Sequence, residues 1–219
     1  MSNPDTSTCV NVSVKAGTMR IGDLEVPVPS GALKIAGGVA FPDNPNNPNG
    51  FDQVFVPPTD GTKGVYAQPI TVPGGIFGLG IPFPGGLTTI TATVEPVANP
   101  TVDVFEQSVK MPVRLKIGNP TLGNNCYLGS ASNPITLNLD VTQAGTMAPV
   151  AGYPGTASYR NVQHTDTTFA VPGASGCGLL GALNWAVNLR ANAPSQSGKN
   201  SLNTTSDLFV ADADMVRSS

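Results

Sequence analysis

Charged side chains are scarce in this 219-residue chain. Asp, Glu, Lys and Arg make up 11 % of the residues, whereas about 25 % is usual for globular domains. The net charge is −3, and the 11 Lys and Arg residues are scattered along the chain. Nucleic-acid binding needs a clustered basic face, and adsorption to an anionic membrane needs a polybasic segment. The sequence shows neither pattern.

Several motifs that carry chemistry are missing as well. No apolar run reaches 18 residues, so the sequence predicts no transmembrane helix. A single histidine excludes a three-histidine metal site within one chain, and without Cys-x-x-Cys neither a zinc ribbon nor a thioredoxin-like centre is indicated. Phosphate-loop and dinucleotide-binding glycine patterns are absent. We therefore expect no cofactor and no metal.

His164 is the one residue that invites a catalytic interpretation. Asp166 lies two residues away and serines are plentiful, but the sequence has no Gly-x-Ser-x-Gly elbow, and the glycines around Ser175 have the wrong spacing. We interpret His164 as a surface-loop residue. The sequence thus predicts no catalytic residues and a protein that is not an enzyme.

Turn-forming residues are abundant. The chain holds 25 Gly and 21 Pro, spread between strand-like runs, and this distribution argues against long helices. Hydrophobic residues make up 40 %, which is enough to build a core at this length. We expect a single β-rich domain over residues 1–219, with residues 1–50 as a candidate subsidiary sheet and residues 206–219 as a tail.

Alternating patterns predict the strands. Apolar residues occupy every second position over 109–117 and 135–141, and threonines alternate with apolar residues over 89–94. Gly22-Asp23 is suited to a two-residue hairpin turn. Pro112 cannot donate to a strand ladder, so it indicates an edge strand or a bulge.

The remainder of the chain is less regular. We expect an irregular connection over 143–163, a strand over 167–171, a helix over about 178–190 and a last strand over 202–210. The fold class predicted is all-β, an antiparallel β-sandwich or open barrel with one short C-terminal helix.

Three cysteines allow three pairings. Cys126 and Cys177 each lie in a turn of small residues at the end of a predicted element, where two backbones can approach closely. This placement favours a Cys126–Cys177 disulfide that ties the helix to the sheet. The role and pairing of Cys9 stay open.

Residues 73–86 form an apolar segment without any charge. It is too rich in Gly and Pro for a stable helix. Two interpretations compete: a plug that caps one end of the fold, or an exposed contact with a lipid, a wall polymer or a second copy of the chain. The possible contact residues are Ile76, Phe77, Leu79, Ile81 and Phe83.

The segment from Met111 to Leu139, with Gly-Asn-Asn-Cys-Tyr-Leu-Gly around Cys126 and Phe-Ala-Val-Pro-Gly-Ala-Ser-Gly-Cys-Gly ending beside Cys177, resembles a family of uncharacterised secreted β-rich proteins of actinomycete bacteria. The resemblance covers about residues 70–205. It implies export, a Cys126–Cys177 bridge and an extracellular or cell-envelope location. It implies no activity.

These observations rank three functions. The first is a non-enzymatic, exported structural or adhesion protein of the cell envelope or extracellular space. The second is a carrier or binder of an apolar ligand such as an envelope lipid, and the third is a hydrolase with an unrecognised site. We expect secretion or cell-envelope localisation, with a signal peptide removed ahead of the polar stretch Met1–Thr8. The partners considered are an envelope lipid, a cell-wall polymer and a second copy of the chain.

Overall fold

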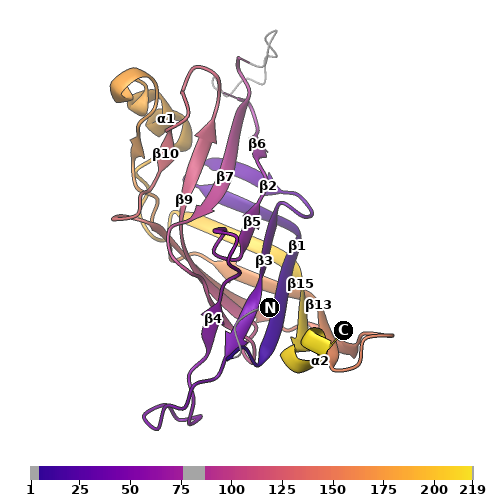
Figure 1. The fold of residues 1–219 in the computed structure, drawn as a ribbon. Coiled ribbons are helices and arrows are strands. Elements are labelled where there is room, and N and C mark those ends of the chain that lie inside the picture. Colours follow the sequence, from indigo (N-terminus) through magenta and orange to yellow (C-terminus); the bar gives the residue numbers. More distant parts are fainter. Residues whose placement is uncertain (1–4, 76–86, 219) are drawn as a thin grey trace.

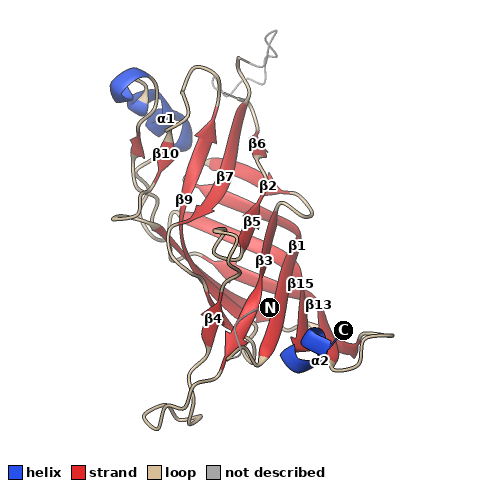
Figure 2. Cartoon of the chain, viewed as in Figure 1, coloured by secondary structure: helices blue, strands red, loops and turns tan. Residues whose placement is uncertain are grey.

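A computed structural model describes residues 5–75 and 87–218 (Figures 1 and 2). Most of this part of the chain is antiparallel β-sheet that curls into a half-barrel. The all-β prediction is confirmed in its open-barrel form. The strands are β1 (Thr8–Ile21), β2 (Leu24–Val28), β3 (Leu33–Ala40), β4 (Val54–Val56), β5 (Val65–Ala67), β6 (Ile70–Val72), β7 (Ile90–Pro96), β8 (Thr101–Asp103), β9 (Ser108–Gly118), β10 (Tyr127–Leu128), β11 (Ile135–Gln143), β12 (Thr146–Pro149), β13 (Thr156–Asp166), β14 (Ala174–Ser175) and β15 (Asn200–Asp212).

The main path through the sheet runs β14-β10-β9-β11-β13-β15-β1-β3-β4. Three short strands extend β9 and β1 at their sides: β7 and β8 pair with β9, and β2 pairs with β1. The first long strand and the last therefore lie next to each other at the centre of the sheet. Two short helices complete the fold, α1 (Asn184–Ala191) beside β10 and β14, and α2 (Ala213–Ser218) after β15.

The period-2 patterns place their apolar residues on the concave face. In β9 the buried residues are Val109, Met111, Val113, Leu115 and Ile117. β11 continues the same inner face over its first half. The hairpin predicted around Gly22-Asp23 joins β1 to β2. These strands are the confirmed part of the sequence prediction.

Pro112 does not lie on an edge strand, so that part of the prediction is wrong, but the ladder beside it is interrupted between the Pro96–Val113 and Thr101–Lys110 pairs. Strand β9 pairs on both sides, with β11 on one side and β7 and β8 on the other. The Val97 N–H donates to the Pro112 carbonyl at 3.0 Å, just past the end of β7. The Pro112 nitrogen, which carries no hydrogen, lies on the same side of the strand as this carbonyl. It therefore faces the break between β7 and β8, where no ladder hydrogen bond is lost.

Other expectations are confirmed only in part further along the chain: the last strand expected over 202–210 is found within β15, and the second half of the expected helix is found as α1. The connection expected over 143–163 contains β12 and most of β13, and the strand expected over 167–171 is largely irregular. The described part of the expected tail, residues 206–218, lies in β15 and α2. The helix expected over 178–190 is a 3₁₀ turn at Leu179–Gly181 followed by α1.

Two bulges bend the three central strands. β1 shifts register between Val14 and Ala16, and β13 shifts between Tyr159 and Val162. Each bulge faces the same part of β15, which pairs with both strands. A bulge bends its strand and increases the local twist, so two bulges side by side account for the sharp curl of the sheet. β1 also changes its second partner here, from β3 to β2.

Asp207 on β15 joins the two bulges on the outer face. Its carboxylate accepts hydrogen bonds from the Asn161 N–H at 3.0 Å and from Arg160 Nη1 at 2.8 Å, and Lys15 Nζ lies 3.6 Å away. Asn161 has a left-handed backbone (φ 58°), which asparagine tolerates. Burial alone would raise the pKa of Asp207, but these hydrogen bonds and positive charges outweigh it and lower the pKa.

We expect Asp207→Asn to reduce the free energy of unfolding by about 1–2 kcal/mol, because a nearly buried charge-assisted bond to Arg160 is lost while the cations keep partial access to water. Chemical denaturation at neutral pH measures the change. The matched control is Asp23→Asn, which removes an exposed carboxylate 3.7 Å from Arg20 and should change stability little. Equal effects of both substitutions would contradict the role assigned to Asp207.

Candidate functional site

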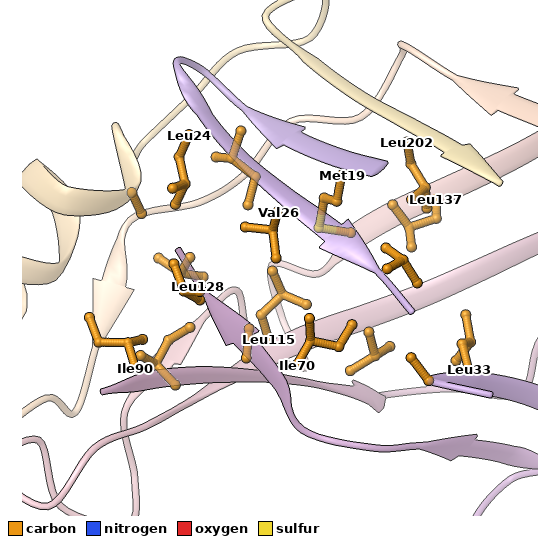
Figure 3. Close-up of a pocket in the computed structure, with 18 of the residues that line it drawn as sticks. Met19, Leu24, Val26, Leu33, Ile70, Ile90, Leu115, Leu128, Leu137 and Leu202 are labelled. Carbon is orange, nitrogen blue, oxygen red and sulfur yellow. The ribbon is translucent and has the colours of Figure 1, made fainter. Parts of the chain in front are cut away.

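An apolar cavity of about 80 Å³ lies inside the concave face of the half-barrel (Figure 3). All of its lining residues are apolar except Arg190 and Thr204. One water needs about 10–15 Å³ by the same measure, so the cavity is several times larger than a packing defect. The residues that line it are Met19, Ile21, Leu24, Val26, Val28, Ala32, Leu33, Ile70, Val72, Ile90, Ala92, Val94, Leu115, Ile117, Leu128, Leu137, Val187, Arg190, Ala191, Leu202 and Thr204.

Two walls of the cavity come from opposite flanks of the curled sheet. One consists of the β1–β2 hairpin and the start of β15, and the other of β6, β7 and β9. In β2 the alternation directs Leu24, Val26 and Val28 to the cavity, and the charged Glu25 between them is exposed. The same alternation in β7 contributes Ile90 and Val94. The cavity thus exists because strands that are not neighbours face each other across the curl.

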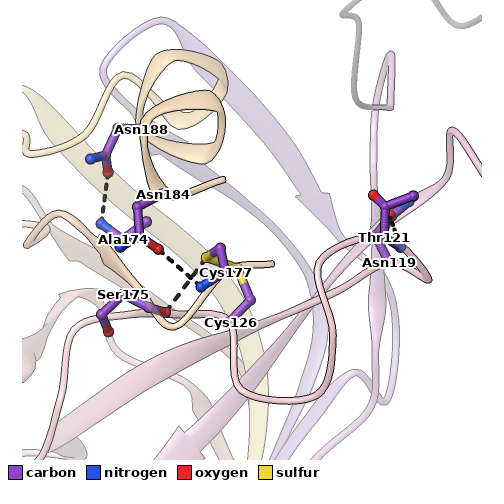
Figure 4. The surroundings of a disulfide bond; sticks show 8 residues. All are labelled: Asn119, Thr121, Cys126, Ala174, Ser175, Cys177, Asn184 and Asn188. Atoms are coloured by element: carbon purple, nitrogen blue, oxygen red, sulfur yellow. Dashed lines mark hydrogen bonds between the residues drawn. A yellow bond between two sulfur atoms is a disulfide. The ribbon is translucent and has the colours of Figure 1, made fainter. Parts of the chain in front are cut away.

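Helix α1 forms the end wall, and each of its faces has a different environment. Val187 and Ala191, four residues apart, line the cavity. Asn184 and Asn188 face the adjoining loop: Asn184 Oδ1 accepts from the Cys177 N–H at 2.9 Å, and Asn188 Oδ1 accepts from the Ala174 N–H at 2.6 Å (Figure 4). These two bonds fix which face of the helix looks into the cavity.

The Cys126–Cys177 disulfide lies under this helix, with both cysteines fully buried and their Cα atoms 4.1 Å apart. This confirms the pairing that the sequence favours. Cys126 directly precedes β10, whose Leu128 lines the cavity, and Cys177 leads into α1. Closing a loop of this length stabilises a fold by roughly 4 kcal/mol in the chain-entropy model. The bridge therefore secures the end wall to the sheet.

Arg190 connects the helix to the opposite flank of the sheet. Its Nε donates to the Gly75 carbonyl at 2.8 Å, and its Nη2 donates to the Pro73 carbonyl. Both carbonyls lie just after β6, a cavity strand. A charged side chain at the cavity margin is therefore satisfied by backbone oxygens, so its charge is not buried without partners.

The apolar segment singled out in the sequence lies mostly outside the part of the chain that the structure describes. Ile76, Phe77, Leu79, Ile81 and Phe83 are all outside the described residues. The competing interpretations of this segment therefore stay predictions. Sequence reasoning missed the cavity itself, because its residues carry the same alternating pattern as ordinary core strands.

Two buried polar atoms on the inner face have no hydrogen-bond partner among the described residues: Thr204 Oγ1 and His164 Nδ1. Thr204 and His164 are directly opposed in the β13–β15 pairing, so their side chains emerge on the same face. Thr204 also lines the cavity. An orphaned buried hydroxyl is costly, and a ligand atom in the cavity is one way to satisfy it.

His164 is buried on β13, which overturns its interpretation as a surface-loop residue. Its Nε2 contacts the Gln107 carbonyl at 2.8 Å, so this nitrogen carries the proton in the neutral ring. Asp166 does not orient it, because the Asp166 carboxylate accepts from Asn138 N at 2.6 Å and from Thr168. Ser175 lies on β14, beyond β10 and next to α1. The structure does not assemble these residues into a triad.

Other parts of the described surface provide weaker candidate sites. Within residues 5–75 and 87–218 no group of three or more His, Cys, Asp or Glu side chains has the arrangement of a metal site. A larger hollow, of about 690 Å³, lies beside the β1–β2 turn and the loop over 192–201. Its lining is polar and its side chains are largely exposed, so it imposes little shape on a ligand. None of the described helices is long and apolar enough to cross a membrane.

Stability should depend on pH through His164, the only histidine of the chain. Burial lowers its pKa below the ordinary 6.5, although the bond to Gln107 and the charge of Asp140 oppose the shift. Below about pH 6.5 the unfolded chain binds a proton that the folded chain does not, so the free energy of unfolding falls as the pH falls.

His164→Gln removes this titration and should flatten the dependence between about pH 7 and pH 5, where no other side chain has its unperturbed pKa. Denaturant unfolding across this range measures both proteins. Parallel curves for wild type and variant would show that the folded state does not disfavour the charged ring.

Comparisons of the chain with protein-family models, with curated proteins and with solved structures find no match. The resemblance to secreted actinomycete proteins therefore stays a prediction, and the geometry of the cavity is the basis for assigning a function.

Proposed function

We propose that the protein binds an apolar ligand in the cavity of the half-barrel. The observation that carries the proposal is the lining: only Arg190 and Thr204 among its residues are not apolar. Water is a poor occupant of such a space, because a buried water typically makes about three hydrogen bonds. An apolar group gains dispersion contacts with the walls and leaves water at the same time.

The size and chemistry of the cavity restrict the ligand. A volume of about 80 Å³ fits a short length of alkyl chain or one small ring, not a whole polycyclic lipid. Thr204 supplies the one orphaned hydroxyl in the lining. The ligand class that fits best is an aliphatic chain with a single hydrogen-bonding group, as found in fatty alcohols, fatty acids and their esters.

We therefore rank the binding of an apolar ligand above the structural or adhesion role that the sequence analysis ranked first. A purely structural domain gains from a closely packed core, and a cavity lowers its stability. The buried disulfide agrees with an oxidising, extracellular environment. We propose secretion or cell-envelope localisation on this basis, and an envelope lipid as the natural source of the aliphatic ligand.

The direct test is extraction of the natively purified protein with organic solvent, followed by mass spectrometry of the extract. We expect an aliphatic molecule in a fixed ratio to the protein. Delipidated protein should then bind a series of straight-chain alcohols, with affinity rising with chain length until the cavity is full. Absence of any extracted aliphatic molecule, together with no affinity across the alcohol series, would refute the proposal.

Ala191→Leu should weaken this binding. The larger side chain would extend from α1 into the cavity and occupy the ligand's space, so we expect at least a tenfold loss of affinity, corresponding to about 1.4 kcal/mol. Filling a cavity leaves the melting temperature unchanged or raises it. The matched control is Ala186→Leu on the same helix, because Ala186 does not line the cavity. Isothermal titration with the alcohol series compares both variants, and equal affinities would contradict the assignment of the site.

A further inference from the structure

The outer face of the α1 region exposes large apolar side chains. Leu179 is 84 % exposed, Leu180 99 %, Trp185 67 % and Leu189 78 %. Trp185 and Leu189 are four residues apart on α1 and therefore share one face of the helix. That face points away from the cavity, because Val187 and Ala191 occupy the opposite side. We call these four residues the α1 patch.

The backbone of the α1 patch holds one of these side chains at an energetic cost. Leu180 has a left-handed conformation (φ 54°), which is uncommon for residues other than glycine, asparagine and aspartate. Gly178 and Gly181, also at positive φ, form the tight turn around it. A fully exposed leucine in a strained turn is not explained by packing. Such an outlier supports a search for a function at that position.

We propose that the α1 patch docks on a lipid surface by inserting its four side chains among the lipids. Leucine and tryptophan are the side chains that interfacial helices bury at the boundary of headgroups and acyl chains. Figure 1 shows α1 at one end of an elongated molecule. A protruding apolar tip can enter a fluid bilayer without a complementary partner shape.

The area of the patch argues against a second copy of the chain as the occupant. A standard interface buries about 800 Å² on each partner, and the smallest stable ones bury about 600 Å². If each of the four side chains contributed about 150 Å², the lower end for an aromatic residue, the patch would supply only about 600 Å². Two protruding tips would bury less than that against each other.

The charges around the patch also fit a lipid surface. No Asp or Glu occurs between Asp166 and Asp207, whereas this stretch contains Arg190 and Lys199. The carboxylate of Asp23 reaches α1 through Asn192 Nδ2 at 3.4 Å, and Arg20 lies 3.7 Å from it. The protein is acidic as a whole, but at this end the carboxylates of Asp23 and Glu25 are balanced by Arg20, Arg190 and Lys199, so no local excess of negative charge repels an anionic bilayer.

Trp185 is the only tryptophan in the chain, so its fluorescence reports on the patch alone. We expect the protein to co-sediment with vesicles of phosphatidylcholine and at least as well with vesicles of phosphatidylglycerol, and the Trp185 emission to shift to shorter wavelength in both. Brominated phosphatidylcholine in the vesicles should quench this emission. No co-sedimentation with either vesicle, or binding without an emission shift and without quenching, would overturn the proposal.

The double variant Leu180→Asn/Leu189→Gln should weaken vesicle binding by at least about tenfold, because two inserted side chains are lost. Asparagine tolerates the left-handed backbone and glutamine is a good helix former, so the fold should persist by circular dichroism. The matched control is Met147→Gln on β12, which removes a 64 % exposed apolar side chain elsewhere and should bind as wild type. Unchanged binding by a folded double variant would refute the patch as the contact.

Two further outcomes separate docking on lipid from self-association and from ligand binding in the cavity. A blue shift that grows with protein concentration in the absence of vesicles, together with a doubled mass in sedimentation equilibrium, would identify a second copy as the occupant and overturn docking on lipid. Ala191→Leu fills the cavity without altering the patch, so it should still bind vesicles. Loss of ligand binding and loss of vesicle binding are therefore distinguishable.

Discussion

The ion-paired carboxylate of Asp207 is the interaction on which the shape of the molecule depends. It lies on the central strand β15 and holds the bulged segments of both neighbouring strands through Asn161, Arg160 and Lys15. Without paired bulges the long strands β1, β13 and β15 would form a flatter sheet, and the two flanks would not face each other. The curl of the sheet, and with it the enclosed apolar space, follows from the two bulges that this outer-face contact holds together.

Helix α1 combines functions that larger proteins distribute over several elements. Its eight residues supply two side chains to the cavity, two amides that fasten the adjoining loop, an arginine that holds the far flank and two side chains to the exterior. The helix cannot turn or shift without altering all of these contacts.

The sequence predicted those elements whose side chains obey one simple period. Val109 to Ile117 alternate without interruption, and the class of fold follows from such runs. β13 escaped prediction because the bulge at Arg160 and Asn161 breaks its alternation, and His164 was assigned to a loop for the same reason. The cavity could not be predicted from the sequence, because a residue such as Val26 has the same place in an alternating strand pattern whether the core around it is filled or contains a cavity. Whether space remains between the two walls depends on the curl of the sheet, and residues far apart in the sequence set that curl jointly.

The pairing of β1 with β15 has a consequence for the order of events in folding. Thr8 pairs with Asp212, so the centre of the sheet joins residues from nearly opposite ends of the described chain. Contacts between residues so far apart form slowly, because a long loop must close first. Nor can they form during synthesis until the last long strand has left the ribosome. Strands β1 and β13 therefore stay without their shared partner until synthesis has passed β15.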